Sequence, residues 1–83
     1  MLHGWKKIVK KSRIVPDTSI IIDQYLSQNI EKLSLSEIII HNAVIAELEN
    51  QANQNKETGF IGLEEINKLQ EFSKKSKFLI KFS

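Results

Sequence analysis

The sequence predicts an α/β fold, a small three-layer structure in which a parallel sheet is flanked by helices. Three short aliphatic runs of strand length stand at residues 12–16, 37–41 and 78–82. The segments between them carry apolar residues at helical spacing, bounded by residues that favour helix caps. Strands that alternate with helices in one chain form parallel sheets with right-handed crossovers. The length of 83 residues allows one such domain with a small core.

The first strand leads directly into a helix. Pro16 suits the last position of the strand because it has no N–H to donate to a neighbouring strand. The helix is expected from about Ser19 to Leu26, with Thr18 or Ser19 as its N-cap. Residues 27–36 then form a polar connection with some helix.

The second strand leads into a longer helical region. Asn42 is a good N-cap for a helix at residues 43–53, whose apolar residues share one face. The polar stretch at residues 53–59 is interpreted as a turn, and residues 63–72 as a second helix before the last strand. The two glycines in residues 58–62 are expected to serve the turn and a close approach of helices, because the lysine and strand of a phosphate loop are missing.

Composition narrows the chemistry that the chain can perform. It has no cysteine, which excludes disulfides and thiolate metal sites, so a metal would be held by oxygen atoms or by His3 or His41. No apolar run approaches the roughly 20 residues of a membrane span, and the first residues show no apolar core of a signal peptide. We therefore expect a soluble cytoplasmic protein with no membrane partner.

Charge is divided between the ends and the middle of the chain. Residues 1–13 and 74–83 hold nine of the twelve Lys and Arg residues and no acid, whereas residues 14–73 hold all ten acids. An acidic middle suits a divalent cation, while basic ends suit RNA or single-stranded DNA. Lysine-rich ends that only keep the protein soluble are the alternative. The candidate nucleic-acid-binding residues are Lys6, Lys7, Lys10 and Lys11.

Acidic residues follow the first two strands. Asp17 stands at the junction of the first strand and its helix, and Glu47 and Glu49 lie in the helix after the second strand. The carboxyl ends of parallel strands meet at one edge of a sheet, where open α/β folds bind ligands. Helical periodicity puts both glutamates at the borders of the apolar face, so it does not choose between them.

Three blocks in this order resemble the amino-terminal half of a PIN domain. They are Val-Pro-Asp-Thr-Ser at residues 15–19 followed by Asp23, Glu-Ile-Ile-Ile at 37–40 leading to Ala-Val-Ile-Ala-Glu-Leu-Glu at 43–49, and Glu-Thr-Gly-Phe-Ile-Gly at 57–62. The sequence is most similar to the PIN domain at the start of archaeal ATPases that carry PIN and KH domains. The resemblance covers residues 13–82 and rests on the ordered set, because the Asp-Thr-Ser step alone recurs by chance.

The resemblance implies a metal-dependent ribonuclease-type fold in which several acids hold Mg²⁺ or Mn²⁺ at the carboxyl edge of the sheet. By that pattern Asp17 is the metal ligand of the first strand and Glu47 is the second acid, and both would be catalytic. Thr18 or Ser19 would support the site through a hydroxyl group. Asp23 matches an acid that this subgroup has in its first helix and is a further supporting residue.

The sequence departs from the family pattern in its acids. The family's third and fourth acids belong to a later helix and to the end of a fourth strand, which this sequence does not contain. We therefore expect a basic segment at residues 1–12 and the amino-terminal part of a PIN-like domain at 13–83, lacking the last strands and helices. A site with only two acids would bind Mg²⁺ or Mn²⁺ weakly or not at all.

The remaining polar candidates are given structural interpretations. Glu49, Glu64 and Glu65 are expected on solvated helix faces, because charged helix residues are rarely buried. His41 stands where the family often has proline, and it is interpreted as a residue at the end of a strand rather than a metal ligand.

Three function classes fit these observations. The favoured one is a PIN-like fragment of a nucleic-acid-processing ATPase, with an incomplete metal site and a role in oligomerisation or regulation. The alternatives are a metal-dependent endoribonuclease that cleaves RNA or single-stranded DNA, and a nucleic-acid-binding module without catalysis. The expected partners are the rest of a longer ATPase chain and a second copy of this chain. In such a homo-oligomer the open edge at Ile14 and Val15, with the helix that starts near Ile20, would lie at the interface.

Overall fold

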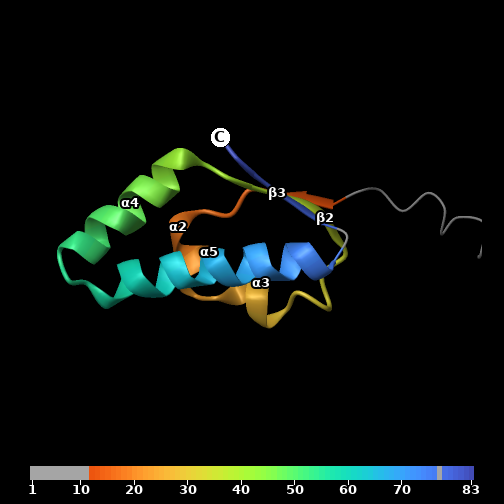
Figure 1. Cartoon of the computed structure of the whole chain (residues 1–83), viewed down its shortest axis with the longest axis horizontal. Helices are drawn as coiled ribbons and strands as arrows, with labels where there is room; N and C mark the ends of the chain where they lie inside the picture. Colours follow the sequence, from red (N-terminus) through yellow and green to blue (C-terminus); the bar gives the residue numbers. More distant parts are fainter. Residues whose placement is uncertain (1–11, 77) are drawn as a thin grey trace, which may run out of the picture.

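The structure of the chain is a computed structural model that describes residues 12–76 and 78–83. The strands and helices alternate along the chain, as Figure 1 shows. In order they are β1 (Ser12–Ile14), α2 (Thr18–Ile22), α3 (Tyr25–Gln28), β2 (Leu35–Ile40), α4 (Asn42–Asn53), α5 (Glu57–Lys75) and β3 (Leu79–Phe82).

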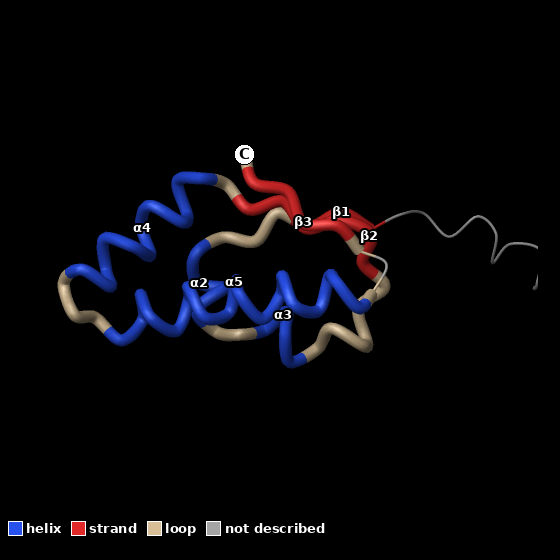
Figure 2. Tube along the Cα trace, viewed as in Figure 1, coloured by secondary structure: helices blue, strands red, loops and turns tan. Residues whose placement is uncertain are grey.

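The three strands form one parallel sheet in the order β1-β2-β3. In its register Ile14 lies beside Ile38, and Ile38 lies beside Ile80, so that these isoleucines share one face of the sheet. The strands follow one another in sequence order across the sheet, so right-handed crossovers place both connections on the same face. Figure 2 shows α2, α3 and α5 together on one side of the strands. The predicted class, a parallel α/β sheet flanked by helices, is confirmed.

The hydrophobic core lies between this face of the sheet and the helices. Strand β2 contributes the most deeply buried side chains of the sheet, because Ile38 and Ile40 are fully buried. Each of the helices α2, α3, α4 and α5 adds at least one buried residue to it. The buried apolar residues are Ile21, Leu26, Ile38, Ile40, Val44, Leu48, Ile66, Leu69 and Phe78.

The helix expected from Ser19 to Leu26 is two short helices instead. Gln24 adopts a left-handed backbone conformation with φ of 61°, which a continuous α-helix cannot contain. Helix α2 therefore ends at Ile22, and α3 begins at Tyr25. The break turns the chain so that Ile21 and Leu26 both enter the core.

Helix α5 begins earlier than the sequence predicts. The turn expected at residues 53–59 is confined to Gln54, Asn55 and Lys56, where Asn55 has φ of 61°. The helix then starts at Glu57, so it includes Gly59 and Gly62, the two glycines that are expected to serve the turn.

Gly59 and Gly62 allow α4 and α5 to pack closely. A Cβ atom on Gly59 would lie 2.7 Å from the carbonyl oxygen of Leu48, and one on Gly62 would meet the side chain of the same leucine. Both glycines are buried inside α5 with ordinary helical backbone angles. The expected close approach of helices is therefore confirmed, while the expected role in a turn is wrong.

The second face of the sheet carries charged residues across all three strands. Glu37 on β2 bonds Arg13 on β1 at 2.8 Å and Lys81 on β3 at 2.7 Å. The glutamate is buried, whereas the two basic side chains are largely exposed. The hydrogen bond from Lys81, and then the one from Arg13, lower the pKa of Glu37 against the opposing effect of burial. One carboxylate thus links the three strands.

In the described part of the chain no helix combines the length and the apolar character needed to cross a membrane.

Candidate metal-binding site

Asp17 lies at the carboxyl end of β1 and caps helix α2. Its Oδ1 atom accepts hydrogen bonds from the backbone N–H of Ile20 and the hydroxyl of Ser19, both at 3.0 Å. These two bonds, the one from Ile20 above all, lower the pKa of Asp17, so the exposed carboxylate is ionised at neutral pH. Both bonds use Oδ1 and therefore do not occupy Oδ2.

Glu47 meets the start of α2 from the neighbouring strand–helix unit. It lies on the exposed side of α4, and its Oε1 atom accepts a hydrogen bond of 2.6 Å from the hydroxyl of Thr18. Thr18 follows Asp17 directly in the chain, so this bond brings the second predicted acid to the same edge of the sheet as the first. The two residues belong to segments 29 positions apart.

The supporting residues differ in what they contact. Thr18 orients Glu47, and Ser19 orients Asp17, each through its hydroxyl group. The backbone N–H of Asp23 bonds the carbonyl oxygen of Ser19 at 2.9 Å where α2 ends, while its side chain is exposed. The structure therefore joins Asp17, Thr18, Ser19 and Glu47 in one set and leaves the Asp23 side chain outside it. The candidate nucleic-acid-binding lysines at positions 6, 7, 10 and 11 lie outside the described residues.

The donor atoms of this set suit a hard divalent cation. Mg²⁺ and Mn²⁺ prefer carboxylate oxygen, and Mg²⁺ is often held by one or two carboxylates with several waters. Asp17 and Glu47 could supply those two carboxylates. Within residues 12–76 and 78–83, no group of three or more His, Cys, Asp or Glu side chains is arranged to hold a metal ion. The donor type of Asp17 and Glu47 therefore fits such a cation, and these two residues are candidate ligands.

Glu65 was wrongly expected on a solvated helix face. Its side chain is 1% exposed, and it accepts hydrogen bonds from the backbone N–H of Ser27 at 2.9 Å and from the Ser27 hydroxyl at 2.6 Å. Spacing could have indicated this, because Glu65 follows Gly62 by three positions and precedes Leu69 by four, on the buried stripe of α5. The expectation is confirmed for Glu49 and Glu64, which are exposed.

His41 lies between β2 and α4, as expected for a residue at the end of a strand. It is exposed, and its Nδ1 atom lies 3.4 Å from the hydroxyl of Ser83, which follows β3. The backbone of Ser83 also accepts a bond from Asn42 and donates one to Ile40. These contacts hold the carboxyl ends of β2 and β3 together.

The described residues form a parallel α/β unit in which Asp17 follows β1 and Glu47 lies in the helix after β2. A curated protein of Methanocaldococcus jannaschii, described as an uncharacterized KH and PIN-domain containing protein, is 44% identical over 61 residues. The match covers 71% of this chain and 10% of that protein. No family model matches the chain.

A solved structure from the same organism has a similar fold. It is described as a domain of a functionally unknown protein, and it aligns with a TM-score of 0.77 and 37% identity over 86% of this chain. This chain spans about half of that solved chain and about a tenth of the curated protein. The expected resemblance to an archaeal protein that contains PIN and KH domains is confirmed.

Proposed function

We propose that this chain is a PIN-like module of a nucleic-acid-processing ATPase, in which Asp17 and Glu47 form one half of a Mg²⁺ or Mn²⁺ site. The hydrogen bond between Thr18 and Glu47 carries the proposal, because it brings the second acid to the edge where Asp17 lies. The association with an ATPase rests on the resemblance of the sequence blocks. Nucleic acid is the proposed substrate class because a PIN domain occurs with a KH domain in the named relative.

The residues around the two acids would prepare them for a cation. The N–H of Ile20 and the hydroxyl of Ser19 lower the pKa of Asp17 and fix the orientation of its carboxylate. The hydroxyl of Thr18 fixes the orientation of the Glu47 carboxylate. Both carboxylates are exposed, so a cation and a phosphodiester could reach them. A bound divalent cation would supply an activated water and stabilise charge on the phosphate.

Two acids alone favour a role other than catalysis for these 83 residues. A cation with two protein ligands keeps most of its waters, and neither the cation nor an attacking water is held firmly enough for efficient hydrolysis. We therefore propose that the module acts in regulation or assembly of the protein that contains it. Endoribonuclease activity is the alternative for a protein that brings further acids to this edge.

Calorimetric titration with Mn²⁺ tests the site. We expect a dissociation constant on the order of 1 mM, with Mg²⁺ weaker, because few ligands and little charge are available. Asp17→Asn should abolish the binding heat and Glu47→Gln should weaken binding. Asp23→Asn and Glu49→Gln are the controls, since these exposed acids lie in the same helices and outside the hydrogen-bonded set, and should bind Mn²⁺ as the unchanged chain does.

Two results would count against the proposal. Stoichiometric binding that survives Asp17→Asn would place the cation elsewhere. Cleavage of single-stranded RNA by the 83-residue chain in Mn²⁺, abolished by Asp17→Asn, would support the endoribonuclease alternative in place of a role without catalysis.

A further inference from the structure

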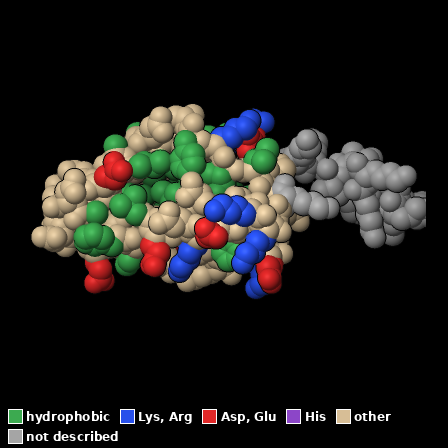
Figure 3. Space-filling view, viewed as in Figure 1, with side chains coloured by type: hydrophobic (Ala, Val, Ile, Leu, Met, Phe, Trp, Pro, Cys, Tyr) green, Lys and Arg blue, Asp and Glu red, His purple; other side chains and the backbone are tan. Residues whose placement is uncertain are grey.

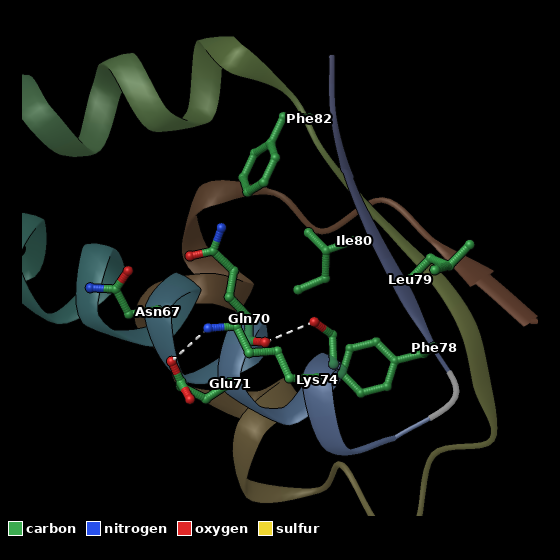
Figure 4. Close-up of a pocket in the computed structure, with 9 residues that line it drawn as sticks. Asn67, Gln70, Glu71, Lys74, Phe78, Leu79, Ile80 and Phe82 are labelled. Carbon is green, nitrogen blue, oxygen red and sulfur yellow. Dashed lines mark hydrogen bonds and ion pairs between the residues drawn. The ribbon is translucent and has the colours of Figure 1, made fainter.

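Strand β3 is an edge of the sheet, and its free side borders a groove. In the described residues β3 pairs with β2 alone. A cavity of about 480 Å³ lies between β3 and α5, and Figure 4 shows side chains from both elements around it. Leu79 is 62% exposed and Phe82 is 43% exposed. An exposed apolar edge with unpaired N–H and C=O groups is a template for another strand.

The sequence of β3 and the residue before it is symmetric about Ile80. Side chains alternate between the two faces of a strand. Those of Phe78, Ile80 and Phe82 therefore share the face that meets α5, and those of Leu79 and Lys81 share the other face. If two such strands pair antiparallel with Ile80 at the centre, Phe78 of one lies opposite Phe82 of the other. The same pairing sets Leu79 of one strand opposite Lys81 of the other.

We propose that β3 pairs antiparallel with β3 of a second copy of this chain, so that two three-stranded sheets join across a two-fold axis near Ile80. Every contact then occurs twice, which is the property of an isologous dimer. The two Phe78–Phe82 pairs would supply aromatic cross-strand contacts, which are among the more stabilising ones in sheets. A core as small as this one also gains from burial against a partner.

Charge on both faces favours a second copy as the occupant. On the outer face, Lys81 meets the apolar Leu79 of the other copy, and the aliphatic part of the lysine side chain can cover it. No lysine meets a lysine there. The ammonium group of Lys81 stays with Glu37, at 2.7 Å.

On the helix face, α5 presents polar groups that complement themselves. Figure 4 shows Lys74 beside Phe78, Gln70 pointing toward Phe82, and Asn67 farther along α5. Seven helix residues and four strand residues span similar lengths, roughly 10 and 13 Å. A two-fold axis at Ile80 therefore sets Lys74 toward Asn67 of the second copy, and Gln70 toward Glu71. Each pair joins a donor with an acceptor, without opposing like charges.

Sedimentation equilibrium of the 83-residue chain at micromolar concentrations tests the interface. The unchanged chain should sediment as a dimer. Leu79→Lys places two lysines opposite each other at both symmetric positions and should raise the dimer dissociation constant roughly tenfold. Leu79→Glu places a carboxylate opposite Lys81 and should leave the constant unchanged or lower it. The side chain of Leu79 is largely exposed, so neither change disturbs the core.

Val15→Lys is the matched control, because Val15 is 48% exposed beyond the opposite edge strand, β1. The proposal requires that this change leaves the dimer intact. A chain that sediments as a monomer would overturn the proposal. So would a dimer that Val15→Lys dissociates and Leu79→Lys does not, because the sheet would then self-associate through β1.

Discussion

At the scale of single residues, the buried carboxylate of Glu65 makes a contact between distant parts of the fold. It holds the first turn region of α3 against the middle of α5 by accepting two hydrogen bonds from Ser27. A buried acid is tolerated where its oxygens are satisfied, and removing it leaves the donors without partners.

Glu65→Ala should therefore destabilise the chain by about 1–3 kcal/mol. The neighbouring Glu64 is exposed, so Glu64→Ala should change the free energy of unfolding by less than about 0.5 kcal/mol. Urea denaturation of the two variants measures both values. Equal effects of the two substitutions would show that the Ser27 contact contributes little.

The roles of some residues can be predicted from the sequence, and those of others cannot. The place of Asp17 between a strand and a helix can be predicted from the sequence. The expected N-cap, Thr18 or Ser19, is wrong, because Asp17 itself caps α2 and Thr18 is the first helical residue. Glu47 was chosen only by resemblance, because its contact with Thr18 bridges two helices that periodicity treats separately. The burial of Glu65 depends on Ser27, which lies in another helix, and the pattern of a single helix does not show such a partner.

At the scale of elements, the charged contact across the sheet predicts how stability depends on pH. Lys81 and Arg13 lower the pKa of Glu37 in the folded chain, so the unfolded chain binds a proton to this group more readily. The stabilisation is present above the unfolded pKa of about 4.3 and is lost as the pH falls through the lower folded value.

Glu37→Gln should therefore flatten the loss of stability between about pH 5 and pH 3. Urea denaturation over this range measures it. Glu71→Gln is the control, because Glu71 is exposed and only its 3.4 Å contact with Lys74 is removed. An acid transition of the same slope in Glu37→Gln and in the unchanged chain would contradict the assignment of this effect to Glu37.

Element boundaries show where local patterns stop being informative. The three strands and the α4 helix can be predicted from the sequence to within about two residues, because aliphatic runs mark the strands. The expected N-cap of α4 is wrong, since His41 takes that position and Asn42 is the first helical residue. The start of α5 was missed because Gly59 resembles a turn signal, whereas its lack of a side chain serves packing against Leu48. The break at Gln24 carries no glycine or proline, so nothing local announced its left-handed conformation.

At the scale of the whole molecule, the parallel sheet collects the candidate groups at one edge. Asp17 follows β1, and Glu47 lies in the helix that follows β2. The residues that line the groove beside β3, drawn in Figure 4, do not include either acid. In the view of Figure 3 the basic side chains of the described residues gather toward the right, while acidic ones also lie toward the left. The proposed metal site and the proposed dimer edge share no residue, so they can be tested independently.

Paramagnetic broadening in the amide NMR spectrum shows whether Asp17 and Glu47 hold the same cation. On addition of substoichiometric Mn²⁺, the account predicts that signals of Thr18, Ser19 and Glu47 broaden before those of α5, and that Asp17→Asn removes this pattern. Broadening centred on Glu64 or elsewhere on α5, or a pattern at the sheet edge that persists in Asp17→Asn, would contradict it.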